Sequence, residues 1–230
     1  MIFDPLYIVM WLPGLLLSIY ASFKVKVTYA KYSKVPTIRG ITGAQAAQSI
    51  LRAAGIYDVG IELSRGFLSD HYDPTKKVLR LSENVYSGNS LASVGVAAHE
   101  AGHAIQHAQG YAPMKLRSAI VPMASIGSNL SWFLLMFGLL FRSQGMILMG
   151  ILFFTAVVLF QVVTLPVEFN ASSRALKALP ASGILADQEV SGARKVLNAA
   201  AMTYVAAAVT SVLQLLYFLI RAGLIGGSDE

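Results

Sequence analysis

Long apolar runs dominate the pattern of hydrophobic and polar positions along this 230-residue chain. A helix needs about 20 apolar residues to cross a bilayer, and four stretches approach or exceed that length. They run from Leu6 to about Phe23, from about Ile120 to Phe141, from about Gly145 to Leu165 and from about Met202 to Leu224. The pattern therefore predicts a mainly α-helical integral membrane protein with about four transmembrane helices.

Two of these stretches have distinctive features. The first lacks a preceding basic region, and basic residues follow it, so we interpret it as an uncleaved anchor and not as a secretory signal. The second is interrupted in its first half by Pro122 and by four polar residues, Ser125, Ser128, Asn129 and Ser131. Hydrocarbon would leave such polar groups unpaired, so we expect this half to pack against protein or to line a wet cavity.

The segment between the first two stretches contains shorter patterns. Thr42 to Ala54 reads as an amphipathic helix, with Thr42 as its cap and Gly55 as its stop. Lys77 to Ser82 alternates apolar and polar residues, as a half-buried strand does. Val59 to Glu62 is expected to pair with it, with a loop over Ser69–Pro74 between them. This small β-ribbon either packs only or offers an exposed edge that holds a peptide by strand addition.

The placement of basic residues predicts the orientation of the chain. The composition is 55% hydrophobic, the net charge is +6, and the pI is near 9.5. Many of the positive charges lie within residues 24–118 and 166–200, close to the apolar stretches, which places both segments on the cytoplasmic side and both termini outside. The predicted organisation is an anchor (1–23), a cytoplasmic region (24–118), a transmembrane hairpin (119–165), cytoplasmic helices (166–200) and a last transmembrane helix with a tail (201–230).

The basic flanks are interpreted as topology signals that also contact anionic lipids. No aromatic-interleaved basic patch supports nucleic-acid binding. The chain has no cysteine, which excludes disulfides and thiolate metal sites, so any zinc site must use imidazole and carboxylate ligands. Nothing in the sequence indicates the oligomeric state.

One motif carries chemistry: His99-Glu100-Ala101-Gly102-His103, within a predicted helix from Leu91 to Gln109. Residues four apart share a helix face, so His99 and His103 can bind one Zn²⁺ ion. Glu100 lies beside them, where it can take a proton from a zinc-activated water as a general base. This pattern is typical of metallopeptidases. The opposing interpretation is a structural ladder of histidines, because His107 continues the same spacing.

A zinc site of this kind needs a third protein ligand, and Glu168 is our prediction for it. Glu168 follows the third apolar stretch, and the hairpin of the second and third stretches returns it to the side of His99. Pro166 suits a helix start, which would place Glu168 in the first turn. A first-turn glutamate that only stabilises the helix dipole is the alternative.

Three further residues near the motif are singled out. His107 can bind metal, stabilise an oxyanion or lie on the surface, and we favour the surface. His71, in a polar turn, is a weaker candidate for oxyanion stabilisation. Gly102 costs about 1 kcal/mol relative to alanine in a helix interior, which indicates that another element approaches the helix closely there.

At these residues the sequence resembles the YugP-like family of bacterial membrane neutral zinc metallopeptidases over nearly the whole chain. The segments that carry the resemblance are Leu68–Pro74, Lys77–Ser82, Ala97–Gln106 and Leu165–Ser172. More distantly it is similar to the HtpX-like and CAAX prenyl proteases, which are membrane gluzincins with a cytoplasmic active site. The resemblance implies a cytoplasmic gluzincin-like zinc domain in this chain.

The wider group has a Glu-x-x-x-Asp pattern, which maps its ligand onto Glu168 and places Ser172 where its aspartate supports a histidine. Either Asn170 or another group takes over that support, or the site is weaker.

Together these observations predict a zinc-dependent endopeptidase of the cytoplasmic membrane that cleaves membrane or membrane-associated proteins. The expected metal ligands are His99, His103 and Glu168, with Glu100 as the general base. The alternative is a zinc-stabilised membrane interaction or regulatory protein with little or no hydrolysis. An intramembrane protease of the site-2 type is disfavoured, because the predicted zinc helix is too polar for a membrane span and the third ligand is a glutamate.

Overall fold

The computed structural model describes residues 4–66 and 69–225. The first residues of the predicted anchor, Leu68 of the family-like segment and the last residues of the predicted tail lie outside the described residues. The chain divides into two compact units. The apolar unit comprises Met1–Tyr20, Lys115–Leu165 and Thr203–Glu230, and the mixed unit comprises Ala21–Met114 and Pro166–Met202.

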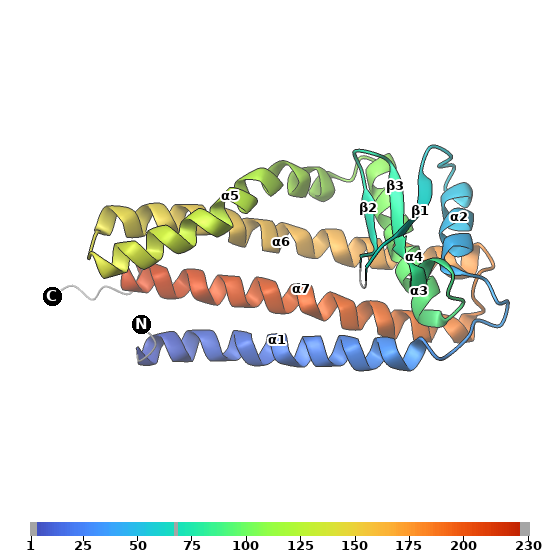
Figure 1. Cartoon of the computed structure of the whole chain (residues 1–230), viewed down its shortest axis with the longest axis horizontal. Coiled ribbons are helices and arrows are strands. Elements are labelled where there is room, and N and C mark those ends of the chain that lie inside the picture. Colours follow the sequence, from blue (N-terminus) through green and yellow to red (C-terminus); the bar gives the residue numbers. More distant parts are fainter. Residues whose placement is uncertain (1–3, 67–68, 226–230) are drawn as a thin grey trace. The chain divides into compact units, whose positions relative to one another are not determined.

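Four long helices account for most of the chain (Figure 1): α1 (Pro5–Tyr32), α5 (Ala112–Leu140), α6 (Gln144–Ala181) and α7 (Asp187–Arg221). Among the described residues, these four are long and apolar enough to cross a membrane. Each of the four predicted apolar stretches falls largely within one of them. The prediction of a mainly helical chain with four candidate membrane spans is therefore confirmed.

Helix α6 corrects one expectation of the sequence analysis. Pro166 was expected to start a new helix, but it lies inside α6, which runs unbroken from Gln144 to Ala181. Membrane helices tolerate internal proline because neighbouring groups satisfy the freed carbonyl. Glu168 is therefore far from the first turn of its helix, and its role is not to stabilise a helix dipole.

The apolar unit packs through close helix contacts. A Cβ atom added to Gly127 on α5 would lie 2.7 Å from the carbonyl oxygen of Phe153 on α6, so these two helices approach closely at that point. A hydrophobic cluster in this unit buries Leu135, Ile151 and Tyr217. The hydroxyl of Tyr217 on α7 donates a hydrogen bond to Asp4 Oδ2 over 3.1 Å, which ties the two ends of this unit's chain together.

The mixed unit contains a three-stranded sheet of β1 (Gly60–Ser64), β2 (His71–Asp73) and β3 (Val78–Ser82) in the order β1-β3-β2. The predicted pairing is confirmed, since β1 runs parallel to β3 with Glu62 opposite Arg80. The expected loop over Ser69–Pro74 is wrong in its centre, where β2 pairs antiparallel with β3. Tyr72 is only 9% exposed, and its burial provides a reason for this short strand to form.

Three further helices complete the mixed unit: α2 (Gly43–Ala53), α3 (Glu83–Tyr86) and α4 (Leu91–Ala108). The predicted cap of α2 is confirmed, because the side chains of Thr42 and Gln45 cap each other's backbone N–H groups. Helix α4 is almost wholly buried and lined with small residues such as Ala97, Ala98 and Ala101. Small side chains let the part of α6 after Pro166 pack closely against α4.

Candidate metal centre

The three predicted ligands meet at one point of the mixed unit. His99 and His103 come from α4, and Glu168 comes from α6. Glu168 Oε2 lies 3.2 Å from His99 Nε2 and 3.7 Å from His103 Nε2. One ligand atom from each residue lies within 4.8 Å of the other two. The structure thus brings together the residues that the sequence analysis selected from separate segments.

This donor set fits zinc. Zn–N and Zn–O bonds of about 2.0–2.2 Å in a tetrahedral arrangement separate the ligand atoms by about 3.4 Å, and the two measured separations bracket that value. The side chains of Glu168, His103 and His99 are 4%, 9% and 14% exposed. The site is therefore largely buried but open to solvent on the side of His99.

Gln106 fixes the tautomer of His103. Its side-chain Nε2 donates to the carbonyl oxygen of Val167 over 2.8 Å, which identifies the other atom of the amide as the oxygen. That oxygen lies 3.0 Å from His103 Nδ1 and can only accept, so Nδ1 must carry the proton. The lone pair of His103 is then on Nε2, the nitrogen that faces Glu168 and can bind a metal.

Gln106 is also the centre of a buried network that joins α4 to α6. It is fully buried, and its Nε2 donates a second bond to Asn170 Oδ1 over 3.0 Å. The same oxygen accepts a bond of 2.6 Å from Arg174 Nε. Sequence analysis missed this role of Gln106; the available signal was a glutamine three residues after His103, on the same buried helix face.

Ser172 supports the other histidine. Its Oγ lies 3.0 Å from His99 Nδ1, and in the tautomer that leaves Nε2 for metal, Nδ1–H donates to this oxygen. Ser172 therefore occupies the place that the pattern of the HtpX-like and CAAX prenyl proteases gives to an aspartate, and it makes the expected contact without a charge. Asn170, the other candidate for this support, bonds to Gln106 instead.

Gly102 lies where α4 and α6 are closest. A Cβ atom at this position would lie 2.5 Å from the carbonyl oxygen of Ala171, a distance that side-chain carbons do not tolerate. The expected close approach at Gly102 is thus confirmed. Gly102 lies between the two histidines of α4, and Ala171 lies three residues after Glu168 on α6. The glycine therefore allows the two ligand-bearing helices to meet.

Glu100 is 8% exposed, and among the described residues no hydrogen bond or ion pair is recorded for its carboxylate. Glu100 directly follows His99 in α4, and its negative charge is among the causes that raise the pKa of His103. Burial alone would lower the pKa of His103, but the negative charges of Glu168 and Glu100 close by raise it above its usual value overall. Glu168 and Glu100 therefore contribute negative charge near the histidines, which favours a bound cation.

The remaining histidines lie outside the ligand cluster. His107 Nδ1 is 2.8 Å from the hydroxyl of Tyr72, so this residue connects α4 to strand β2. His71 is exposed on β2 and not in a turn as expected, and its Nδ1 lies 2.8 Å from the backbone oxygen of Ser69. Neither is among the three residues that converge as candidate metal ligands.

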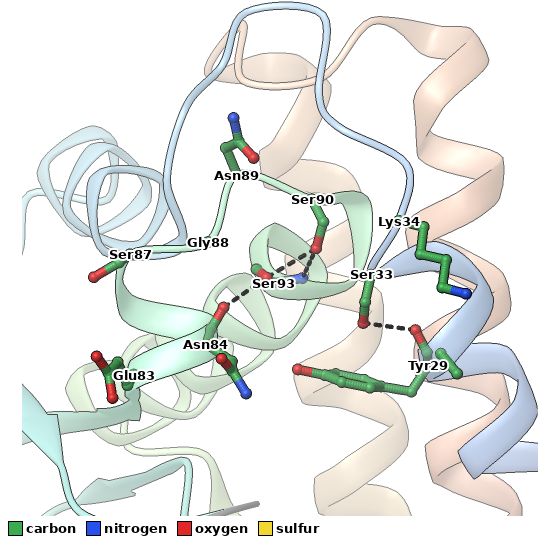
Figure 2. A pocket seen from close by; sticks show the side chains of 11 residues that line it. Tyr29, Ser33, Lys34, Glu83, Asn84, Ser87, Gly88, Asn89, Ser90 and Ser93 are labelled. Atoms are coloured by element: carbon green, nitrogen blue, oxygen red, sulfur yellow. Dashed lines mark hydrogen bonds between the residues drawn. The ribbon is translucent and has the colours of Figure 1, made fainter.

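A separate pocket of about 740 Å³ lies elsewhere in the mixed unit (Figure 2). Two of its labelled hydroxyls donate to the backbone: Ser33 donates to the carbonyl of Tyr29, and Ser93 donates to that of Asn84. None of the three candidate metal ligands lines this pocket. Its lining residues are Tyr29, Ala30, Ser33, Lys34, Glu83, Asn84, Ser87, Gly88, Asn89, Ser90 and Ser93.

Comparison with known proteins agrees with this geometry. Over residues 7–223 the chain matches the family described as "Putative neutral zinc metallopeptidase", and it belongs to that family. It is 47% identical over 225 residues to the "Putative membrane protease YugP" of Bacillus subtilis (strain 168), a match that covers 98% of this chain and 99% of the relative. No solved structure matches the chain. The family resemblance stated from the sequence is therefore confirmed.

Proposed function

We propose that this protein is a membrane-embedded zinc endopeptidase of the gluzincin type that cleaves membrane or membrane-associated proteins. The observation that carries the proposal is the convergence of His99, His103 and Glu168 at zinc-binding separations, with Glu100 next to them. The family description and the name of the relative support the same class of activity.

Each residue of the centre has a defined task in this proposal. His99 and His103 offer Nε2, and Glu168 offers a carboxylate oxygen. When bound, Zn²⁺ supplies a Lewis acid that polarises the scissile carbonyl and lowers the pKa of water. Glu100 takes the proton from the attacking water and passes it to the leaving amine. Its freedom from other hydrogen bonds among the described residues suits a group that must accept and release a proton.

The sheet suggests where an extended substrate binds. Strand β3, which contains most of the predicted Lys77–Ser82 strand, is paired on both sides and cannot accept another strand. The outer edges belong to β1 and β2. Strand β2 is joined to the motif helix α4 through the contact of Tyr72 with His107. We therefore place the substrate along the free edge of β2, where strand addition would hold the backbone of an extended peptide.

The proposed location is the cytoplasmic membrane, with several membrane-spanning helices and the metal centre on the cytoplasmic side. Its support is the excess of lysine and arginine in residues 24–118 and 166–200. Basic residues near the first stretch, such as Lys24 and Lys26, would also contact anionic lipids.

The decisive experiment replaces Glu100 by glutamine in the purified full-length protein. This variant should retain zinc at wild-type stoichiometry and lose hydrolysis of a mixed peptide library by a factor of 100 or more, in line with the loss of a general base, which is worth about 10²–10⁴. Glu83→Gln is the matched control, because Glu83 is an exposed glutamate outside the centre, and it should retain full activity.

Wild-type hydrolysis by Glu100→Gln would refute the mechanism. A wild-type protein that binds zinc but cleaves nothing in the library, nor any membrane protein in a proteome comparison with the Glu100→Gln strain, would favour the alternative of a zinc-stabilised interaction protein.

A further inference from the structure

One face of helix α5 in the apolar unit carries exposed polar side chains. Ser125, Ser128 and Asn129 are all exposed, and their spacing of three and four residues places them on the same side of the helix. The neighbouring side of the helix is buried and includes Ala124 and Ser131. Of the polar residues that interrupt the second apolar stretch, Ser131 therefore packs inside the unit, whereas the other three do not.

This polar face lies at the middle of a predicted membrane span. Asn129 follows Ile120 by nine residues and precedes Phe141 by twelve. Its amide Nδ2 donates to the carbonyl oxygen of Ser125 over a long 3.4 Å, and the hydroxyl of Ser128 donates to the same oxygen over 2.9 Å. An amide has two donor hydrogens and an oxygen with two lone pairs, so most of the hydrogen-bonding capacity of Asn129 is unused within the described residues.

Lipid chains cannot satisfy this remaining capacity, and polar groups at mid-membrane depth usually face a protein partner. Large apolar side chains surround the polar face, and Trp132 and Ile126 are 62% and 61% exposed. Small hydroxyl side chains beside an amide allow two membrane helices to approach closely and to form a hydrogen bond between them. The face therefore has the composition of a helix–helix contact.

We propose that this face of α5, defined by Ser125, Ser128, Asn129 and Trp132, is the contact surface for a second copy of the chain. Two copies with the same topology are related by a two-fold axis normal to the membrane, so identical residues meet at identical depth. An amide is complementary to itself, because each Asn129 donates to the oxygen of the other. A second copy thus supplies the matching group at the matching depth, whereas any other helix would need an unrelated polar residue there.

The absence of cysteine in the chain allows a direct test by single-cysteine cross-linking. Ser125→Cys and Ser128→Cys are introduced one at a time and oxidised in native membranes. A disulfide forms only when the two Cα atoms come within about 7 Å, so we expect a product of twice the monomer mass. Leu16→Cys on α1 and Leu152→Cys on α6 are the controls, because both positions are exposed in the same unit, and they should remain monomeric.

A second measurement tests Asn129 itself. The dissociation constant of the dimer in detergent should rise about 8- to 300-fold for Asn129→Leu, the range expected for the loss of both reciprocal hydrogen bonds between membrane helices, and should be restored by Asn129→Gln. The proposal would be overturned if the Ser125→Cys and Ser128→Cys variants remained monomeric after oxidation. Equal cross-linking of the Leu16→Cys and Leu152→Cys controls, or cross-links only to other proteins, would also overturn it. Its outcome does not depend on the zinc chemistry, because none of these residues belongs to the metal centre.

Discussion

Replacing Gly102 by alanine should push apart the two helices that carry the candidate zinc ligands. The new Cβ atom would start 2.5 Å from the carbonyl oxygen of Ala171, and ordinary contact begins at 3.4 Å. Because that oxygen belongs to the backbone of α6, no side chain can rotate away to make room. The contact must lengthen by about 0.9 Å, whereas metal–ligand distances tolerate about 0.2 Å.

The energetic cost follows from the same contact. Overpacking of this kind costs about 1–3 kcal/mol, and the helix preference of alanine over glycine returns at most about 1 kcal/mol. To bind zinc, the variant must restore the wild-type separation of α4 and α6, so the strain appears as a loss of zinc affinity. A penalty of about 1–3 kcal/mol corresponds to zinc binding that is roughly 5- to 150-fold weaker.

The assay is competition for zinc between the purified protein and a chelator of known affinity, together with thermal unfolding of the metal-free protein. Gly95→Ala is the matched control on the same helix, because its Cβ atom would meet the Cβ of Ala193 at an ordinary 3.5 Å. This control should bind zinc normally and be slightly more stable than the wild type. Wild-type zinc affinity in Gly102→Ala would refute the argument that this glycine sets the separation of the ligands.

Three further predictions concern residues around the centre. Gln106→Leu should weaken zinc binding about 10- to 100-fold by freeing the tautomer of His103. Gln48→Leu, a change at an exposed position of α2, should leave zinc binding unchanged; equal effects in the chelator competition would contradict this. Ser172→Ala should reduce zinc affinity less than Gln106→Leu, because Ser172 makes one contact with a ligand and Gln106 joins three groups; the reverse order in the same competition would show that Ser172 is the main support. Tyr72→Phe should lower the free energy of unfolding by about 0.5–1.5 kcal/mol through the lost bond to His107, with unchanged zinc affinity, and a loss of zinc would mean that His107 acts on the centre.

The sequence allowed the prediction of features that depend on local patterns. The four apolar stretches and the capped helix after Thr42 each depend on residues close together in the chain, and all appear in the structure. The convergence of Glu168 with the histidines was also predicted, because a short hairpin between two long helices restricts where the chain can return. The expectation that residues 24–118 and 166–200 lie on the cytoplasmic side of the membrane stays a prediction.

Features that depend on distant partners were missed. Strand β2 is three residues long within turn-like sequence, and it exists because β3 pairs with it and the core buries Tyr72. The support of His103 by Gln106 depends on the carbonyl of Val167, which lies 61 residues further along the chain. Pro166 was taken as a helix start because proline usually breaks helices in water, and a long apolar helix tolerates it.

The separation of the ligands in sequence has a consequence for the newly made protein. His99 and Glu168 are 69 residues apart, and at a synthesis rate of about 5–20 residues per second the carboxylate is added roughly 3 to 14 s after the first histidine. During that interval the nascent chain has the two imidazoles and Glu100 but lacks the third ligand. The candidate metal centre is therefore complete only when the segment after the hairpin has been made and folded against α4, so the proposed proteolytic activity would begin no earlier than that.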